Sequence, residues 1–266
     1  MMLRLVGMPM AAFLTLALTW PSASGSSERP LTQIAIPDPQ RHGRVVLAKL
    51  CLPEGSASSL PLLVYGHGFD CNPQDYDYYC EFAATAMVYH NSRIYLDEDT
   101  KNLAADAAFL AAELPRQAKE NTSSPLFGRL GTTNILGGHS MGGGTSILAA
   151  ATHSPATGMF LTAPGLYTLP YAKPFLKNVT IPSVIVSGSN DCGPNALPKE
   201  AQPTYDGLAS QRKVLIVLKG ANHCGWTRPT EWFGVCAVPE CHHLDRDTQH
   251  HWGVVLASTF SDALAG

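Results

Sequence analysis

The residues best suited to chemistry lie in the glycine-rich segment Gly137–Gly144, which contains Ser140. The segment fits the pattern Gly-x-Ser-x-Gly, in which a serine occupies a strained turn between a strand and a helix. Gly138 and Gly142 stand two residues either side of the serine, where a Cβ atom would collide with neighbouring backbone. The turn places the hydroxyl at the N-terminus of the next helix, whose dipole favours developing negative charge. We therefore interpret Ser140 as a nucleophile.

A glycine-rich loop of this kind can also bind a nucleotide. Here the sequence has no Gly-Lys-Ser/Thr, and no obvious acidic residue ends a following strand about 20 residues on. The pattern therefore favours the nucleophile.

A serine hydroxyl needs a base, and the base needs a carboxylate to orient it. Along the chain, this type of serine is followed first by the acid and then by the histidine. Asp191 comes just after the apolar run 183–187, and His223 comes just after the apolar run 214–218. Both runs predict short buried strands. We expect Ser140, Asp191 and His223 to form a catalytic triad at the ends of three strands.

Acyl transfer also needs backbone N–H groups that bind the oxyanion. The predicted strand 60–65 runs into Gly66-His67-Gly68-Phe69, and the loop after such a strand provides one of these donors. We assign this donor to Phe69, with Gly68 as the alternative, and the second donor to Met141. His67 is expected to support the loop by hydrogen bonding rather than to act as a second base.

The remaining elements determine where these loops can lie. Further short apolar runs predict strands at 45–52, 86–90, 134–136 and 159–161. Helical spacing predicts helices over 100–114, ended or kinked by Pro115, over 141–151, and at the C-terminus with an apolar face of Trp252, Leu256, Phe260 and Leu264. Strands that alternate with helices predict an α/β fold with a mostly parallel, doubly wound sheet and helices on both faces. Ligands then bind beyond the carboxyl ends of the strands.

The quoted motifs carry a resemblance to a known family. Gly66–Phe69, Gly138–Gly143, Gly188–Asp191 and Asn222-His223 are similar to those of the single-domain α/β-hydrolases, which include cutinase-like polyester hydrolases, chlorophyllases and platelet-activating-factor acetylhydrolases. The resemblance spans about Val45 to Phe260 and implies the α/β-hydrolase fold and ester hydrolysis. Met141 after the serine is more like the cutinase-type turn, because chlorophyllase-like enzymes often have arginine there. Residues 87–99 depart from the family pattern.

The N-terminal segment has the features of a signal peptide, with Arg4 near its start, an apolar run to Trp20 and small residues after Pro21. We expect residues 1–24 to be removed and residues 25–266 to form one domain, secreted or in the lumen of the secretory pathway. No stable membrane insertion is expected after cleavage. The net charge of −3 gives no reason to expect a nucleic acid partner, and we expect a monomer whose partner is its ester substrate.

Seven cysteines behind a signal peptide predict disulfides. Cys192 follows Asp191 directly and Cys224 follows His223 directly. If the acid contacts the base, these two cysteines lie close enough to pair. Cys236 and Cys241 are expected to close a small loop. Cys71 is expected to pair with Cys80, which leaves Cys51 as the odd thiol.

Residues 163–181 lie between two predicted strands and are too few for a large lid. Their apolar side chains, Leu166 and Tyr167 among them, would line an open, shallow cleft, or alternatively pack on the core. The histidine-rich segment 242–251 matches no metal-binding spacing and is interpreted as a solvated loop before the last helix. The triad needs no metal and no cofactor. Asn121 and Asn178 begin glycosylation sequons that matter only in a eukaryotic host.

The sequence therefore predicts a secreted serine esterase without a lid, which hydrolyses carboxylic esters through an acyl-enzyme intermediate. Two alternatives stay open. The same triad serves other acyl hydrolases and transferases, such as a thioesterase, a peptidase or a chlorophyllase-like enzyme. The fold also supports non-catalytic binding modules, because fold alone does not fix function.

Overall fold

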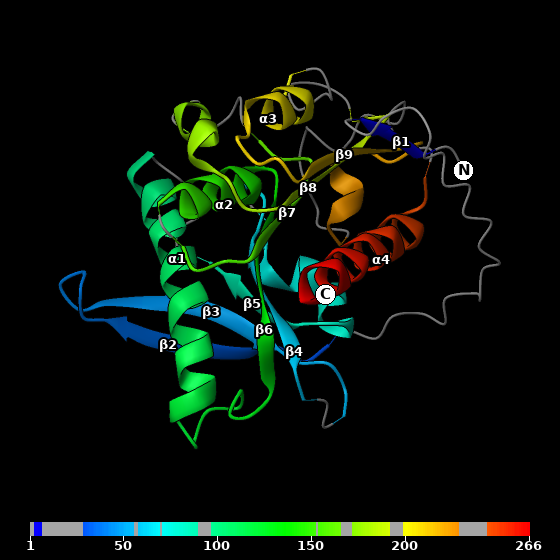
Figure 1. The fold of residues 1–266 in the computed structure, drawn as a ribbon. Coiled ribbons are helices and arrows are strands. Elements are labelled where there is room, and N and C mark those ends of the chain that lie inside the picture. The colour runs from blue at the N-terminus through cyan, green and yellow to red at the C-terminus, as the bar shows by residue number, and fades with distance from the viewer. Residues whose placement is uncertain are drawn as a thin grey trace.

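The apolar runs of the sequence form one mixed sheet at the centre of the protein (Figure 1). The computed structural model describes residues 3–6, 29–55, 58–69, 71–89, 97–152, 154–165, 172–191, 199–228 and 244–266. In this part of the chain the strand order is β1-β9-β8-β7-β6-β4-β5-β3-β2. The strands are β1 (Leu3–Val6), β2 (Thr32–Asp38), β3 (Arg44–Cys51), β4 (Leu60–Gly66), β5 (Ala84–Val88), β6 (Leu130–His139), β7 (Gly158–Thr162), β8 (Ser183–Gly188) and β9 (Lys213–Leu218).

Six neighbouring strands, from β5 through β4 to β9, run parallel. They are joined by antiparallel β3 and β2 at one edge and by antiparallel β1 at the other. Every residue of β5, β7 and β8 is buried, as expected of strands covered on both faces. The predicted mostly parallel sheet is confirmed. Sequence reasoning did not anticipate β2, whose side chains are mostly exposed or half-buried.

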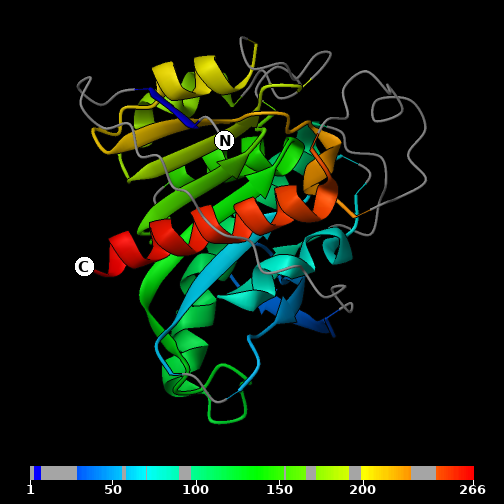
Figure 2. The same ribbon diagram turned by 90° about the vertical axis from the view of Figure 1, so that its right-hand side faces the viewer.

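Helices cover both faces of the sheet (Figures 1 and 2). The α-helices are α1 (Asp97–Glu120), α2 (Met141–Ala151), α3 (Ala201–Gly207) and α4 (Arg246–Ala265), and the 3₁₀ helices are η1 (Pro73–Glu81), η2 (Lys173–Asn178) and η4 (Cys224–Trp226). One apolar core lies between the sheet and α1, α2, η2 and α3, and a second lies between the sheet and η1 and α4. No helix in the described residues is long and apolar enough to cross a membrane.

Pro115, expected to end or kink α1, does not end it, because the helix continues to Glu120. Proline lacks an N–H group, so it cannot donate to the carbonyl of Ala111 one turn earlier. The side-chain amide of Asn134 on β6 donates to that carbonyl instead, at 2.7 Å. The sheet therefore replaces the helical hydrogen bond that proline removes.

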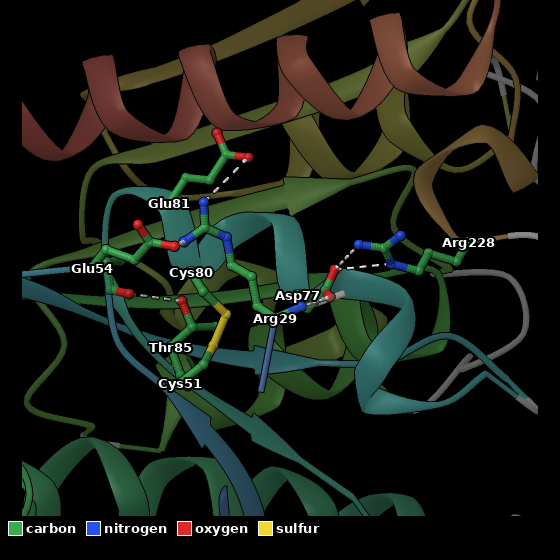
Figure 3. The surroundings of a disulfide bond; sticks show 9 residues. Arg29, Cys51, Glu54, Asp77, Cys80, Glu81, Thr85 and Arg228 are labelled. Atoms are coloured by element: carbon green, nitrogen blue, oxygen red, sulfur yellow. Dashed lines mark hydrogen bonds and ion pairs between the residues drawn. A yellow bond between two sulfur atoms is a disulfide. The ribbon is translucent and has the colours of Figure 1, made fainter. Parts of the chain in front are cut away.

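The predicted Cys71–Cys80 pairing is wrong, because Cys80 on η1 is bonded to Cys51 at the end of β3 (Figure 3). The two Cα atoms are 5.7 Å apart, within the range that a disulfide spans. Cys71 lies before η1, and its Sγ donates to the carbonyl of Phe69 at 3.5 Å. Cys224 is also disulfide-bonded. Its partner lies outside the described residues, as do Cys192, Cys236 and Cys241. The Cys192–Cys224 and Cys236–Cys241 pairings therefore stay predictions.

The last helix begins at Arg246, earlier than expected, with the side chain of Asp245 as its N-cap. The interpretation of 242–251 as a solvated loop is therefore wrong for its second half. His250 is buried in α4 and stacks on Tyr78 of η1, with 4.1 Å between ring centroids. Burial lowers the pKa of His250 to about 3, so the ring is neutral. His242 and His243 lie outside the described residues.

Candidate active site

Ser140 occupies the turn between β6 and α2 with φ 53° and ψ −120°, a conformation that is strained for a residue with a Cβ. Its N–H donates to the carbonyl of Thr162 on the neighbouring strand, at 3.2 Å. A Cβ on Gly138 would overlap the carbonyl of Gly142, and a Cβ on Gly142 would overlap the carbonyl of Gly66. The glycines are therefore required by close backbone approach, as the sequence pattern indicated.

Asp191 and His223 come together because their strands, β8 and β9, are parallel neighbours. The two loops that follow are also joined directly: Asn190 N–H donates to the carbonyl of Ala221 at 2.9 Å, and a Cβ on Gly188 would overlap that same carbonyl. At the end of the loops, Nδ1 of His223 lies 3.3 Å from Oδ2 of Asp191. The geometry has the imidazole donating from Nδ1, which leaves Nε2 to accept a proton.

The carboxylate of Asp191 is buried, and this burial raises its pKa. The hydrogen bond from His223 opposes that shift, because it stabilises the ionised form. Oδ1 of Asp191 is buried with no hydrogen-bond partner among the described residues. The imidazole of His223 is thus hydrogen-bonded to a buried carboxylate.

His139, directly before Ser140, brings the nucleophile turn and the base loop together. Its ring centroid lies 4.7 Å from that of His223, with 46° between the planes. The ring is buried, and this burial together with the nearby charge of His223 holds its pKa well below 6.5. A neutral ring therefore packs beside His223, one residue away from Ser140. Its Nδ1 is hydrogen-bonded to the hydroxyl of Tyr76 at 2.8 Å.

The loop after β4 has the expected place beside the nucleophile turn. Nδ1 of His67 donates to the carbonyl of Gly68 at 2.7 Å, and the ring is buried, in line with a supporting role. The N–H of Gly68 donates to the hydroxyl of Tyr76 at 2.9 Å, so this group is already engaged. That engagement favours Phe69 over Gly68 as the oxyanion donor. Met141, the other expected donor, is the first residue of α2, where N–H groups lack acceptors within the helix.

Gln249 on α4 is a site residue that sequence reasoning missed. Its side chain is fully buried and binds both main-chain groups of Asn222, the residue before His223. Asn222 N–H donates to Oε1 at 3.1 Å, and Nε2 donates to the carbonyl at 2.8 Å. Asn222 in turn accepts Gly225 N–H through its side chain at 2.7 Å. Hydrogen bonds to Gln249 and to Gly225 therefore hold the main chain and the side chain of Asn222, next to His223.

Helix η1 also holds the chain after the base loop. Asp77 accepts two hydrogen bonds from Arg228, at 3.0 and 2.6 Å, and the hydroxyl of Tyr78 donates to the carbonyl of Trp226 at 2.9 Å. Figure 3 shows that Asp77 also accepts the main-chain N–H of Arg29, and that the Cys51–Cys80 disulfide lies on the same helix. The Asp77 carboxylate and the disulfide of Cys80 thus tie the segments of Arg29, Cys51 and Arg228 to one helix.

Leu166 and Tyr167, the expected cleft residues, lie outside the described residues. Phe69, the last residue of the 66–69 loop, is half exposed. Within the described ranges, no group of three or more histidine, cysteine, aspartate or glutamate side chains could hold a metal ion.

Comparison with known proteins supports the fold and the chemistry. Residues 97–251 match the family described as PETase, PET hydrolase-like. The structure is similar to Est1E from Butyrivibrio proteoclasticus, with a TM-score of 0.59 and 14% sequence identity over 87% of this chain and 99% of that one. A comparison with curated proteins finds no significant match. The predicted α/β-hydrolase fold is confirmed.

Proposed function

Since the chain belongs to the PET hydrolase-like family and is a carboxylic ester hydrolase, we propose that Ser140 is its nucleophile, His223 its base and Asp191 the carboxylate that orients the base. One observation carries this assignment. His223 is hydrogen-bonded to Asp191 at 3.3 Å, and the other side of its ring packs near His139, the residue before Ser140.

The reaction follows from this arrangement. Nε2 of His223 takes the hydroxyl proton of Ser140 while Oγ attacks the ester carbonyl carbon. The carbonyl oxygen becomes an oxyanion that accepts the N–H groups of Phe69 and Met141. When the intermediate collapses, the C–O bond to the alcohol breaks and His223 protonates the departing oxygen. Water then attacks the acyl-serine with the same base, releasing the acid and restoring Ser140.

The protein is proposed to act outside the cell or in the secretory lumen. The disulfides of Cys51–Cys80 and Cys224 support an oxidising compartment. Residues 3–6 of the proposed signal peptide form β1, which pairs with β9. Cleavage after residue 24 would remove β1 and leave β9 as the edge of the sheet. N-terminal sequencing of the secreted protein tests this proposal, because a mature chain that still begins at Met1 would contradict it.

The site is proposed to be open and to take apolar or aryl acyl groups. The half-exposed ring of Phe69 beside the oxyanion loop supports this, because a substrate acyl group near the carbonyl would contact it. Dispersed monomeric esters should then be hydrolysed as readily as emulsified long-chain esters. Clear activation by an ester–water interface would contradict the open site.

The test of the triad is hydrolysis of p-nitrophenyl esters by the wild type and by Ser140→Ala. Removing the nucleophile should lower kcat by about 10⁴-fold or more. A fluorophosphonate probe should label the wild type at Ser140, as shown by peptide mass spectrometry, and leave the variant unlabelled. Thioester and anilide substrates assayed in parallel test the other acyl chemistries. Equal rates for the two proteins would overturn the triad.

A further inference from the structure

The hydroxyl of Tyr76 connects the two halves of the proposed site. Tyr76 is fully buried on η1, beneath the oxyanion loop. Its oxygen accepts the N–H of Gly68 at 2.9 Å and is hydrogen-bonded to Nδ1 of His139 at 2.8 Å. One atom therefore contacts the loop that precedes Phe69 and the residue that precedes Ser140.

The hydroxyl of Tyr76 can serve both neighbours at once. Gly68 N–H can only donate, so it occupies a lone pair of the phenol oxygen. Nδ1 of His139 accepts the hydroxyl hydrogen in one neutral tautomer and donates to the second lone pair in the other, so the bridge forms with either tautomer. The Tyr76 and His139 rings lie 5.8 Å apart and are tilted.

Each end of this bridge fixes a group that the reaction needs. The hydrogen bond from Gly68 N–H fixes the orientation of the His67–Gly68 peptide. The next peptide, Gly68–Phe69, carries the N–H that is proposed to bind the oxyanion. There is little spare room at this loop, since a Cβ on Gly68 would lie 2.9 Å from Nδ1 of His139 and 3.2 Å from the Tyr76 hydroxyl. At the other end, the held ring of His139 is the surface beside which His223 packs.

We propose that Tyr76 is a positioning residue for ester hydrolysis, whose hydroxyl holds the oxyanion loop and the His139 ring in one fixed arrangement. The inference rests on the proposed function, because it assumes that Phe69 donates to the oxyanion and that His223 is the base. It assigns Tyr76 no contact with the substrate. Its effect is on the geometry of the transition state, where a misplacement of about 1 Å can cost about 10²-fold in rate.

The test compares Tyr76→Phe with a matched control, Tyr79→Phe. Tyr79 is on the same helix and equally buried, but its hydroxyl lies among Tyr65, Tyr78 and Thr162 rather than at the Gly68–His139 bridge. Tyr76→Phe should lower kcat for a p-nitrophenyl ester by about 10- to 100-fold with KM changed less than about threefold. It should weaken binding of an alkyl boronic acid, which mimics the tetrahedral intermediate, by a similar factor. Tyr79→Phe should change neither.

A second arm keeps the test decisive if Tyr76→Phe is unstable. His139→Leu removes the bridging nitrogen, whereas His139→Asn offers an amide group near the position of Nδ1. The leucine variant should lose boronic acid affinity, and the asparagine variant should recover at least part of it; equal loss in both would overturn the bridge. Where Tyr76→Phe folds, the losses in Tyr76→Phe/His139→Leu should be less than additive, because both changes break one hydrogen bond, and fully additive losses would also overturn the bridge.

The outcomes separate this inference from the proposed function. If Ser140→Ala keeps its activity, the triad is wrong whatever the tyrosine variants do. If Ser140→Ala is inactive and Tyr76→Phe matches Tyr79→Phe in kcat and boronic acid affinity, the triad stands and the positioning role of Tyr76 is wrong. Thermal unfolding of each variant, with all assays run well below the lowest Tm, removes loss of folded protein as a cause.

Discussion

Gly142 and Gly66 approach so closely that a Cβ atom on Gly66 would lie 2.8 Å from the Cα of Gly142. The contact joins the first turn of α2 to the end of β4, so it sets the distance between the nucleophile turn and the oxyanion loop. Backbone lies on both sides of the contact, and no side chain can rotate away to make room. The distance between the two proposed oxyanion donors, Phe69 and Met141, therefore depends on glycine at positions 66 and 142.

Gly142→Ala should accordingly prevent stable folding or cost several kcal/mol of unfolding free energy, because its Cβ would overlap the carbonyl of Gly66. The control is Gly253→Ala in α4, where the Cβ would meet the Tyr79 hydroxyl at 3.2 Å and the Tyr78 ring at 3.4 Å. At Gly253 the higher helix propensity of alanine offsets the tight contacts with the two tyrosines, so the unfolding free energy should change by about 1 kcal/mol or less. Urea unfolding measures both. Similar stability of the two variants would contradict the close backbone approach.

Ser140→Gly should make the protein more stable while abolishing ester hydrolysis. Serine at φ 53° and ψ −120° is strained by about 1–3 kcal/mol, and glycine adopts this conformation without that cost. The greater entropy of glycine in the unfolded chain subtracts about 0.5–1 kcal/mol. A net gain of about 1 kcal/mol over Ser140→Ala is expected, because alanine retains the Cβ. Calorimetric Tm values decide this, and a glycine variant less stable than the alanine variant would argue against strain.

The disulfide between Cys51 and Cys80 should contribute about 3–4 kcal/mol of stability, since it closes a loop with a sequence separation of 29. Cys51→Ala/Cys80→Ala should lower the unfolding free energy by that amount, seen as a lower midpoint of urea unfolding. It should also lower kcat, because η1 carries Tyr76. Adding reductant to this double variant tests the remaining disulfides, that of Cys224 among them. An unchanged unfolding midpoint in the double variant would show that η1 is held without the bond.

The turn of Ser140 and the proximity of Asp191 to His223 could be predicted because each depends on a local pattern. Ser140 needs glycines close to it in the chain, and Asp191 and His223 each follow an apolar run that predicts a strand. Parallel neighbours in the sheet then bring the two loops together. Short-range information was sufficient for these positions and for most strands, whereas the triad roles stay a proposal.

Other features depend on contacts between distant segments and could not be predicted in this way. Pro115 is tolerated because Asn134, on another element, replaces the missing donor. Cys51 and Cys80 meet because β3 pairs with β5 just after η1. Gln249 is a polar residue in a helix, and nothing local indicates that it binds Asn222. In each case the partner is chosen by the tertiary fold.

The last prediction concerns Asp75, near the start of η1. Burial raises the pKa of its carboxyl from 3.8 to about 6, although the Asn72 N–H that it accepts at 2.8 Å acts in the opposite direction. The folded state therefore holds the proton more tightly than the unfolded state does. Its stabilising effect is fully present below pH 3.8 and is lost as the pH rises through about 6. Above that pH, the ionised carboxylate makes folding less favourable.

Asp75→Asn keeps an oxygen that can accept the N–H of Asn72 but removes the titration. The unfolding free energy of the variant relative to the wild type should therefore rise between pH 4 and pH 7.5, by up to about 3 kcal/mol for a shift of about two pKa units. Urea unfolding of both proteins at the two pH values measures the difference. Asp245→Asn is the contrasting control, because hydrogen bonds from Thr248 lower the pKa of Asp245. A lowered pKa titrates below 3.8, so the relative stability of Asp245→Asn should stay nearly constant between pH 4 and pH 7.5. A parallel rise in both variants would contradict burial as the cause at Asp75.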